Sequence, residues 1–371
     1  MRVAVDATSL LDVRTGVGRF THEIVTRLAG RPGLELTIFP VSIRGHRRLR
    51  SLAPSGARVL TPPLPARLLR RAWLRWDAPS IDRVVGPQDV VYGPNFVVPP
   101  SRASRVMTVH DLTPLRFPEL CDRDTLDYPG QIQRAASSGA WIHTSTRAIR
   151  DEVVSELGVP AQRVVVVPMA HTTQAGGDED AGRRLAGRQA YVLAVGTIEP
   201  RKDLTTLVRS ISALADSGTE VPLVHVGPDG WALHAFETAV AASGRPDLVT
   251  RLGMRSEAEL RDLYAGARAV VYPSRYEGFG FPVLEAMSAG TPVITTRVPA
   301  IEEVAGEAAV LVDVGDDAGL ADAIRRVWTD DALVGDRRQA GLRRVQAFDW
   351  DATANGLIEL LRTATGDASG L

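Results

Sequence analysis

The chain has 371 residues, which is long enough for two domains that each bury a core of their own. Its net charge of −1 argues against a protein dedicated to nucleic acid, and its single cysteine excludes an internal disulfide and a zinc cluster built from cysteines. The chain opens like a strand rather than a signal peptide, and no apolar run approaches the ~18 residues of a membrane span, so we expect a cytoplasmic protein.

The first half of the chain begins with a strand, a glycine-containing loop and a helix. Residues 2–6 form a short apolar run, residues 11–18 read as a loop with Gly16 and Gly18, and apolar residues recur at helical spacing over 20–28. Two glycines alone are weak evidence for a nucleotide site, since half of the dinucleotide-binding fingerprint is missing. Further strands are expected at residues 34–39, 89–92, 105–109, 140–144 and 163–167.

Residues 42–76 are strongly basic, with nine arginines and no Asp or Glu. Within this segment, one helical face would carry Leu69, Ala72, Trp73 and Trp76, and another would carry arginines. A basic amphipathic helix suits an anionic membrane surface, although a solvated arginine face with inward tryptophans fits the same pattern. The arginines could also bind phosphate on a substrate. The residues assigned to a membrane or acceptor surface are Arg67, Arg70, Arg71, Trp73 and Arg75.

Strand 105–109 ends in His110-Asp111-Leu112-Thr113-Pro114. Open α/β sheets bind ligands at the carboxyl ends of their strands, so His110 is expected to be a site residue rather than a structural histidine. By local chemistry alone, His110 and Asp111 could form a base dyad for an inverting reaction.

Residues 171–188 are polar, acidic and rich in glycine, which is typical of a linker between domains. Asp178-Glu179-Asp180 and Asp122-Arg123-Asp124 both match an Asp-x-Asp metal-binding pattern. Because such short matches in irregular segments arise by chance, we assign no metal.

The second half of the chain begins with the same order of a strand, a glycine-containing loop and a helix. Strand 191–195 is followed by Gly196-Thr197-Ile198-Glu199-Pro200-Arg201-Lys202-Asp203 and then by a helix from residue 204. This strand-to-helix turn would aim Arg201 and Lys202 at a ligand, with a forked set of donors on the arginine and a point charge on the lysine. Strands at 222–226 and 248–252 end in Gly227 and in Gly253-Met254.

A second strand, glycine loop and short helix follow at residues 269–290. Pro282 suits the first turn of a helix and Gly290 the position just past its end, so the loop before Pro282 would face a helix N-terminus that favours anions. The acids Glu277 and Glu285 would repel a phosphate there. They more plausibly accept hydrogen bonds from hydroxyl groups of a sugar or ribose.

Three of these motifs together resemble the signature of retaining GT-B glycosyltransferases of family 4. The motifs are Thr-Val-His-Asp-Leu-x-Pro, Gly-Thr-Ile-Glu-Pro-Arg-Lys and Tyr-Glu-Gly-Phe-Gly-Phe-Pro, and they are similar to those of bacterial mannosyltransferase-like members that build surface polysaccharides. The resemblance implies an α/β fold of two Rossmann-like domains that face each other across a cleft. It would place an acceptor domain at 1–172, a linker at 173–188, a donor domain at 189–346, and a C-terminal helix at 347–371 that packs on the first domain.

The resemblance also implies roles for single residues. Glu277 would hold hydroxyls of the donor sugar and Glu285 the ribose, while Arg201 and Lys202 would grip the diphosphate and His110 would lie beside the reacting sugar. Many members carry an arginine where this chain has Thr197, so Arg201 would take that whole role or the diphosphate would be held less tightly. The remaining donor-binding residues would be Gly16, Gly18, Asp111, Gly227, Gly253, Met254, Gly278, Phe279, Gly280 and Leu284.

The implied reaction moves a hexose with retention, mannose from GDP-mannose, to a glycan or lipid-linked acceptor at the inner membrane face. The nucleotide sugar is a co-substrate, and the resemblance implies no metal and no other cofactor. Alternatives are a UDP- or dTDP-sugar donor, a sugar-nucleotide epimerase of the same fold, and a non-catalytic subunit that binds a sugar nucleotide.

Overall fold

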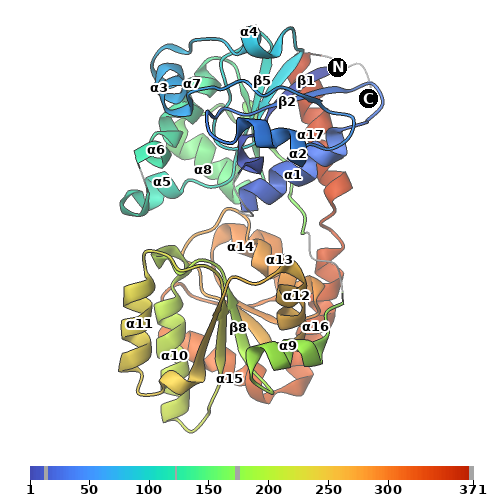
Figure 1. Ribbon diagram of the computed structural model, residues 1–371. Coiled ribbons are helices and arrows are strands. Elements are labelled where there is room, and N and C mark those ends of the chain that lie inside the picture. Colours follow the sequence, from blue (N-terminus) through green and yellow to red (C-terminus); the bar gives the residue numbers. More distant parts are fainter. Residues whose placement is uncertain (12–15, 122, 172–175, 367–371) are drawn as a thin grey trace. The chain divides into compact units, whose positions relative to one another are not determined.

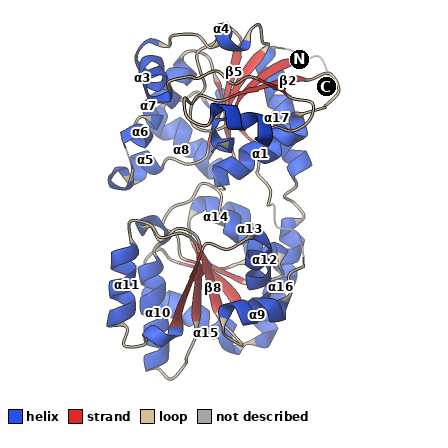
Figure 2. Cartoon of the chain, viewed as in Figure 1, coloured by secondary structure: helices blue, strands red, loops and turns tan. Residues whose placement is uncertain are grey.

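A computed structural model describes residues 1–11, 16–121, 123–171 and 176–366. The chain divides into two compact units, one made of Met1–Met169 with Asp349–Leu371 and the other of Ala170–Phe348. Each unit contains one parallel β-sheet with helices on both of its faces (Figure 2). Because both faces of each sheet are covered, most strand residues are apolar and buried rather than alternating with exposed polar ones.

The first unit is built on a seven-stranded sheet in the order β3-β2-β1-β4-β5-β6-β7. In this sheet Val5 lies opposite both Ile38 and Tyr92, and all three are fully buried. The strands are β1 (Arg2–Asp6), β2 (Glu35–Phe39), β3 (Arg58–Val59), β4 (Val90–Gly93), β5 (Ser104–Val109), β6 (Trp141–Thr144) and β7 (Val164–Val166).

Helices of the first unit cover this sheet, and the last helix of the chain is among them. Helix α17 (Trp350–Thr365) lies beside α1 (Gly16–Leu28), as Figure 1 shows, and Arg27 on α1 pairs with Asp351 on α17 at 3.2 Å. The other helices are α2 (Leu49–Leu52), α3 (Ala66–Trp76), α4 (Asp82–Val85), α5 (Thr113–Arg116), α6 (Arg123–Leu126), α7 (Tyr128–Ser137) and α8 (Arg147–Leu157).

The second unit is built on a six-stranded sheet in the order β10-β9-β8-β11-β12-β13. From β8 the chain runs outward to β10 and then returns to add β11 on the other side of β8, so the strand order reverses between β8 and β11. Ligands of open α/β sheets bind at such a switch point, outside the carboxyl ends of the strands. The strands are β8 (Val192–Val195), β9 (Leu223–Val226), β10 (Val249–Gly253), β11 (Ala269–Tyr272), β12 (Val293–Thr296) and β13 (Val310–Val312).

The core of the second unit forms where helices pack on this sheet. Leu207 and Ile211 of the helix that follows β8 are buried against strand residues such as Val271 and Ile294. The helices are α9 (Glu179–Ala186), α10 (Leu204–Asp216), α11 (Leu233–Ala242), α12 (Glu257–Gly266), α13 (Phe281–Ser288), α14 (Pro299–Ala305), α15 (Asp317–Thr329) and α16 (Asp331–Val345).

Two local expectations differ from the structure. Gly16 and Gly18 lie in the first turn of α1 instead of in a loop before it, because the helix begins at Gly16. Part of the segment expected to be a linker forms helix α9, which is capped by the Asp178 carboxylate on the amide of Ala181 and packs closely on α12. Residues 172–175 of the expected linker lie outside the described residues. So do residues 12–15 of the expected glycine loop.

Candidate active site

The loops at the switch point of the second sheet come together through glycine. Gly196 follows β8 and Gly227 follows β9, and a Cβ atom on Gly227 would lie only 2.0 Å from the carbonyl oxygen of Gly196. The amide of Gly227 donates to the carbonyl of Gly253 at 3.1 Å, so the ends of β8, β9 and β10 are held side by side. Only glycine permits this close approach of backbones.

A buried ionic cluster joins the end of β8 to the end of β11. The carboxylate of Glu277 is 2.6 Å from Lys202 Nζ through Oε1 and 2.7 Å from Arg201 Nη1 through Oε2. Tyr272 at the end of β11 donates its hydroxyl to the same Oε1 at 2.8 Å, and Lys202 Nζ donates to the Tyr272 hydroxyl. The structure therefore brings together Arg201, Lys202 and Glu277, three residues whose roles were expected from the sequence.

Burial and charge act in opposite directions on this cluster. Burial would raise the pKa of Glu277, whose side chain is 9% exposed, but the positive charges of Arg201 and Lys202 outweigh it and lower the pKa to about 2. Burial lowers the pKa of the Lys202 ammonium, and the Glu277 carboxylate opposes that shift. Glu277 is thus an ionised carboxylate that pairs with both cations, and Glu199 pairs with Arg201 as well.

Three further residues fix the geometry of the cluster and were not identified from the sequence. Glu199 accepts from Arg201 Nη2 at 2.6 Å, and Tyr272 bridges Lys202 and Glu277. His225 on β9 donates its Nε2 proton to the Gly196 carbonyl at 2.8 Å, and burial lowers its pKa. His225 and Tyr272 follow apolar strand residues, and a polar side chain at that position is the signal that could have found them.

Helix α13 begins directly after the loop that carries Glu277. Gly280, with φ of +92°, precedes the helix, and a Cβ atom there would lie 2.3 Å from Ile301 Cδ1. Phe279 is buried against the rings of Phe281 and Phe348, so its side chain packs while its backbone lies in the loop. The backbone of Phe279 and Gly280 thus lies in the loop before α13, and their expected role in donor binding stays a prediction.

Glu285 lies within α13 and apart from the ionic cluster. It is buried together with its neighbour Leu284, and its Oε2 accepts a hydrogen bond from the Tyr264 hydroxyl on α12 at 2.8 Å. Met254, which follows β10, is 58% exposed. The two acids of the motif therefore differ in their contacts, because Glu277 pairs with two cations and Tyr272 whereas Glu285 accepts from Tyr264.

The first unit places His110 at the end of β5 in an aromatic setting. Its ring is in edge contact with Phe20 of α1 at 5.3 Å and with Phe96 at 5.6 Å. Nε2 lies 2.8 Å from the Pro94 carbonyl, which can only accept, so Nε2 carries the proton and burial lowers the pKa of the ring. Asp111 Oδ1 accepts instead from the amide of Thr113 at 2.9 Å, which disfavours a His110–Asp111 base dyad.

The residues of the basic segment differ in how far they are exposed to solvent. Arg67, Arg71 and Arg75 are exposed on α3, whereas Arg70 is half-buried. Trp73, expected at the same surface, is instead buried and donates its indole N–H to the Pro79 carbonyl at 3.0 Å. Trp76, which the sequence places on one helical face with Trp73, is 69% exposed.

Residues 1–11, 16–121, 123–171 and 176–366 contain neither a helix that could cross a membrane nor a group of side chains that could hold a metal ion. In that part of the chain no helix combines the length and the apolar character needed to cross a membrane. Within the same ranges, no three His, Cys, Asp or Glu side chains are grouped so that they could hold a metal ion.

Known proteins resemble this chain both in sequence and in fold. The family described as "Glycosyl transferases group 1" matches residues 189–330. O-antigen chain mannosyltransferase B of Escherichia coli is 30% identical over 363 residues, which cover 91% of this chain and 93% of that protein. D-inositol 3-phosphate glycosyltransferase of Rhodococcus opacus (strain B4) is 30% identical over 277 residues, or 70% of this chain and 62% of that protein.

Among solved structures, WaaG, a glycosyltransferase involved in lipopolysaccharide biosynthesis, matches with a TM-score of 0.74 at 17% identity, over 99% of this chain and 100% of that one. The expected α/β fold of the GT-B type is therefore confirmed. On the strength of the sequence match along most of its length, the chain belongs to the group 1 glycosyltransferases.

Proposed function

We propose that the chain is a retaining glycosyltransferase of family 4 that transfers mannose from GDP-mannose to a glycan or lipid-linked acceptor in the synthesis of a surface polysaccharide. The observation that carries this proposal is the pair of largely buried cations, Arg201 and Lys202, which Glu277 contacts at the sheet's switch point. Such a pair suits a diphosphate. The choice of mannose draws on the E. coli relative, which is named as an O-antigen mannosyltransferase.

In the proposed reaction the bond between the anomeric carbon and the donor phosphate oxygen breaks as the bond to the acceptor oxygen forms on the same face. The acceptor proton passes to the leaving diphosphate, which departs as nucleoside diphosphate. Negative charge grows on that group in the transition state, where Arg201, Lys202 and the N-terminus of α13 would stabilise it. This chemistry requires no metal.

Glu277 would change partners during the cycle. In the structure its carboxylate is paired with both cations. A bound diphosphate would take over that role, and the freed carboxylate would accept hydrogen bonds from hydroxyls of the donor sugar. Glu285 would hold the ribose, and Gly253 and Met254 would lie along the base. His110 of the first unit would lie beside the reacting sugar.

We also propose that the enzyme works in the cytoplasm, at the inner face of the membrane. Nucleotide sugars are charged and do not cross a membrane unaided, so the enzyme would bind them in the cytoplasm. A lipid-linked acceptor would be presented from the bilayer. A thermal-shift comparison of GDP-mannose with UDP- and dTDP-sugars identifies the donor, because a bound ligand stabilises the folded protein by mass action. Stabilisation by a UDP- or dTDP-sugar alone would replace GDP-mannose with that donor.

The central test is Glu277→Gln. This variant leaves Lys202 without a charged partner and Arg201 with Glu199 alone, so we expect a loss of about 3 kcal/mol in stability. Transfer should fall by roughly 100-fold or more, as for loss of one transition-state contact. GDP lacks the sugar, so it should bind the variant more tightly than the wild type, since no carboxylate competes with its diphosphate.

Asp317→Asn is the matched control, because Asp317 pairs with Arg209 on the exposed surface of the same unit at 2.5 Å. It should leave transfer and GDP affinity unchanged. Unaltered transfer in a folded Glu277→Gln protein would contradict the proposed site. A wild-type protein that binds GDP-mannose yet transfers nothing to any glycan or lipid-linked acceptor would favour the non-catalytic sugar-nucleotide-binding alternative.

A further inference from the structure

Helix α3 presents two parallel rows of side chains to the solvent. Arg67, Arg71 and Arg75 are spaced four residues apart and form one row, and all three are exposed. Leu68, Ala72 and Trp76 repeat the same spacing one residue later, so they form a second row beside the first. Leu68 is 68% exposed and Trp76 is 69% exposed, and Ala72 between them is half-buried.

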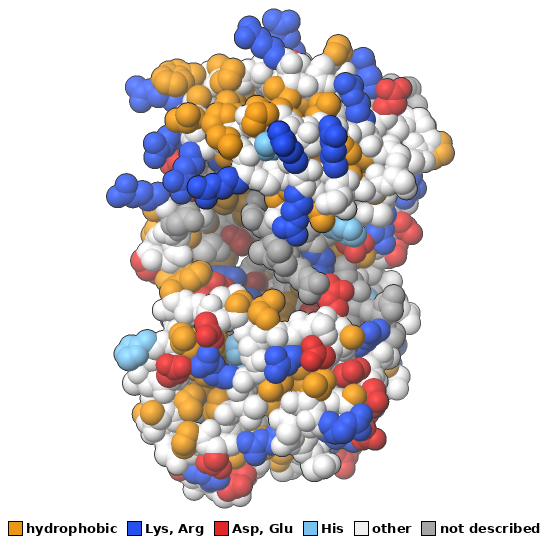
Figure 3. Space-filling model, in the orientation of Figure 1, with side chains coloured by type: hydrophobic (Ala, Val, Ile, Leu, Met, Phe, Trp, Pro, Cys, Tyr) orange, Lys and Arg blue, Asp and Glu red, His pale blue; other side chains and the backbone are white. Residues whose placement is uncertain are grey.

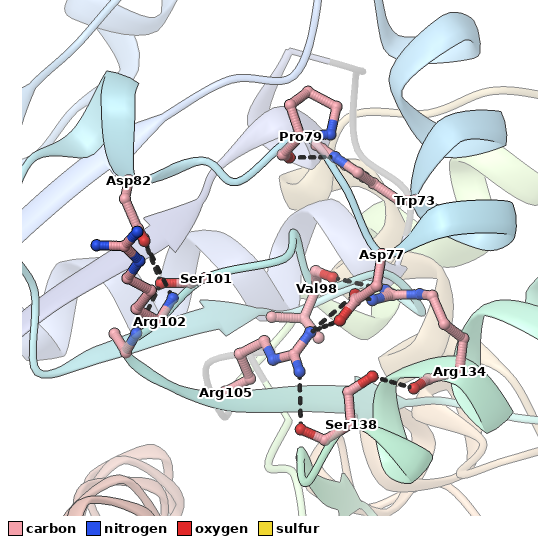
Figure 4. Close-up of polar contacts among 11 residues, drawn as sticks. Trp73, Asp77, Pro79, Asp82, Val98, Ser101, Arg102, Arg105, Arg134 and Ser138 are labelled. Atoms are coloured by element: carbon pink, nitrogen blue, oxygen red, sulfur yellow. Dashed lines mark hydrogen bonds and ion pairs between the residues drawn. The ribbon is translucent and has the colours of Figure 1, made fainter.

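This helix is firmly anchored on its opposite side. Asp77 ends the helix, and its carboxylate pairs with Arg105 Nη1 at 3.0 Å and also with Arg134 (Figure 4). The buried indole of Trp73 donates to the Pro79 carbonyl, and Gln131 Nε2 donates to the Arg70 carbonyl at 2.6 Å. The exposed rows therefore belong to a fixed surface rather than to a frayed end.

The surroundings of α3 extend both its apolar and its basic character. A surface groove of about 710 Å³ runs beside the helix and is lined by Leu74 and Leu126 together with Arg71, Arg75 and Arg123, with Asp124 and Asp127 at its α6 and α7 side. Arg67 reaches Asp124 at 3.3 Å. Figure 3 shows arginine side chains beside exposed hydrophobic ones on this part of the first unit.

The chemistry of the two rows points to a lipid surface. A large exposed indole is suited to a bilayer interface, where the ring lies at the level of the headgroups. The Arg75 guanidinium lies 5.8 Å from the Trp76 ring centroid, so charge and apolar ring face the same side. Arginines can bury their stems along the acyl boundary and keep their charged ends on lipid phosphates.

We propose that α3 docks the first unit on an anionic bilayer, with Leu68 and Trp76 inserted at the headgroup level and Arg67, Arg71 and Arg75 on lipid phosphates. The inference rests on the proposed function in one respect, which is that the bilayer surface is taken to be the cytoplasmic leaflet. Docking needs neither donor nor acceptor, so it is measured without any sugar transfer.

The test is co-sedimentation of the full-length protein with vesicles of phosphatidylcholine, with and without phosphatidylglycerol. We expect binding only where phosphatidylglycerol is present. Each arginine near an anionic surface contributes about a fivefold gain in binding, so replacing Arg67, Arg71 and Arg75 together by Ser should weaken it roughly 100-fold. Leu68→Ser/Trp76→Ser should also weaken binding, and its remaining binding should be the more sensitive to salt.

Two matched controls separate α3 from general effects of charge and apolar surface. The triple replacement of Arg47, Arg48 and Arg50 by Ser removes the same charge from another exposed part of the basic segment, and Trp231→Ser removes a comparably exposed indole from the second unit. Both should bind vesicles nearly as the wild type does. Circular dichroism and thermal melting confirm that every variant is folded.

Several outcomes would overturn the proposal. Equal binding to neutral vesicles, or equal losses in the α3 variants and the controls, would remove α3 as the docking surface. Undiminished binding of folded Leu68→Ser/Trp76→Ser would do the same for the apolar row. If α3 variants instead dissociate a dimer that forms without vesicles, the partner is a second copy of the chain. Failure of the proposed transferase activity would leave the vesicle result unchanged, so the two are distinguishable.

Discussion

His143 on β6 of the first sheet is a fully buried histidine. Its Nδ1 lies 2.9 Å from Thr108 Oγ1 and its Nε2 lies 2.8 Å from the Val167 carbonyl, while Phe20 stacks on the ring at 5.8 Å. Burial lowers the pKa of His143 from 6.5 to about 4, against the effect of the hydrogen bond to Val167. The unfolded chain therefore takes up a proton at a higher pH than the folded protein does.

The sign of the resulting pH dependence follows from this difference. The folded-state pKa is below the unfolded one, so the stability that His143 provides is complete above pH 6.5 and is lost as the pH falls toward 4. We predict a loss on the order of 3 kcal/mol over this range. Urea denaturation at a series of pH values measures it. His143→Gln should flatten the dependence, and exposed His22→Gln should not; parallel curves for all three proteins would refute the assignment.

At the scale of single residues, the sequence predicts the groups that a motif names and misses the groups that position them. Arg201, Lys202 and Glu277 are in recognisable motifs, and the structure places each of the two cations within 2.7 Å of the Glu277 carboxylate. Tyr272 and His225 are parts of apolar strands, and nothing local shows that one bridges the cluster and the other holds the Gly196 loop. Their roles depend on which strands are neighbours, and that is a long-range contact.

Helix α9 shows the same limit at the scale of elements. Its sequence is polar and acidic, which favours a linker, but the helix is stabilised by an Asp178 cap and by close packing on α12. The packing depends on glycines at the crossing point. A Cβ atom on Gly182 would lie 2.0 Å from the Asp262 carbonyl oxygen, and one on Gly266 would lie 2.7 Å from that of Glu179. From propensity alone, glycine in such a segment indicates a turn. Its role in a close contact between two helices becomes visible only in the three-dimensional structure.

Gly182→Ala tests this account of α9. The added methyl group meets backbone, which cannot move aside as a flexible side chain can, so we predict a loss of about 3 kcal/mol in the stability of the second unit. Gly335→Ala on α16 is the matched control, since its methyl group would meet nothing within 4 Å and should stabilise that helix by roughly 0.5–1 kcal/mol. Thermal melting of both proteins gives the comparison. Equal melting temperatures would show that α9 yields easily and is not tightly packed.

At the scale of the whole molecule, the alternation of apolar runs and glycine turns predicts two α/β halves, and the described sheets have that form. Strand β3, with two residues, is too short to leave a pattern. The position of β11 beside β8 also has no local signal, although it creates the switch point where the ionic cluster forms. The chain leaves the first unit at Met169 and returns at Asp349, so the whole of the second unit is one continuous segment.

That continuity yields a prediction for the molecule as a whole. Residues 170–348 contain a complete six-stranded sheet, its covering helices and the cluster of Arg201, Lys202 and Glu277, so this segment should fold alone and bind GDP. The boundary matters, because Phe348 packs on Phe279 at 5.9 Å, and ending the chain at residue 344 should weaken GDP binding. Without His110 and the first sheet, the segment should transfer no sugar. Calorimetric titration with GDP measures the affinity, with Glu277→Gln in the same segment binding more tightly. A folded segment that fails to bind GDP, while the full chain binds it, would mean that the first unit supplies part of the nucleotide site.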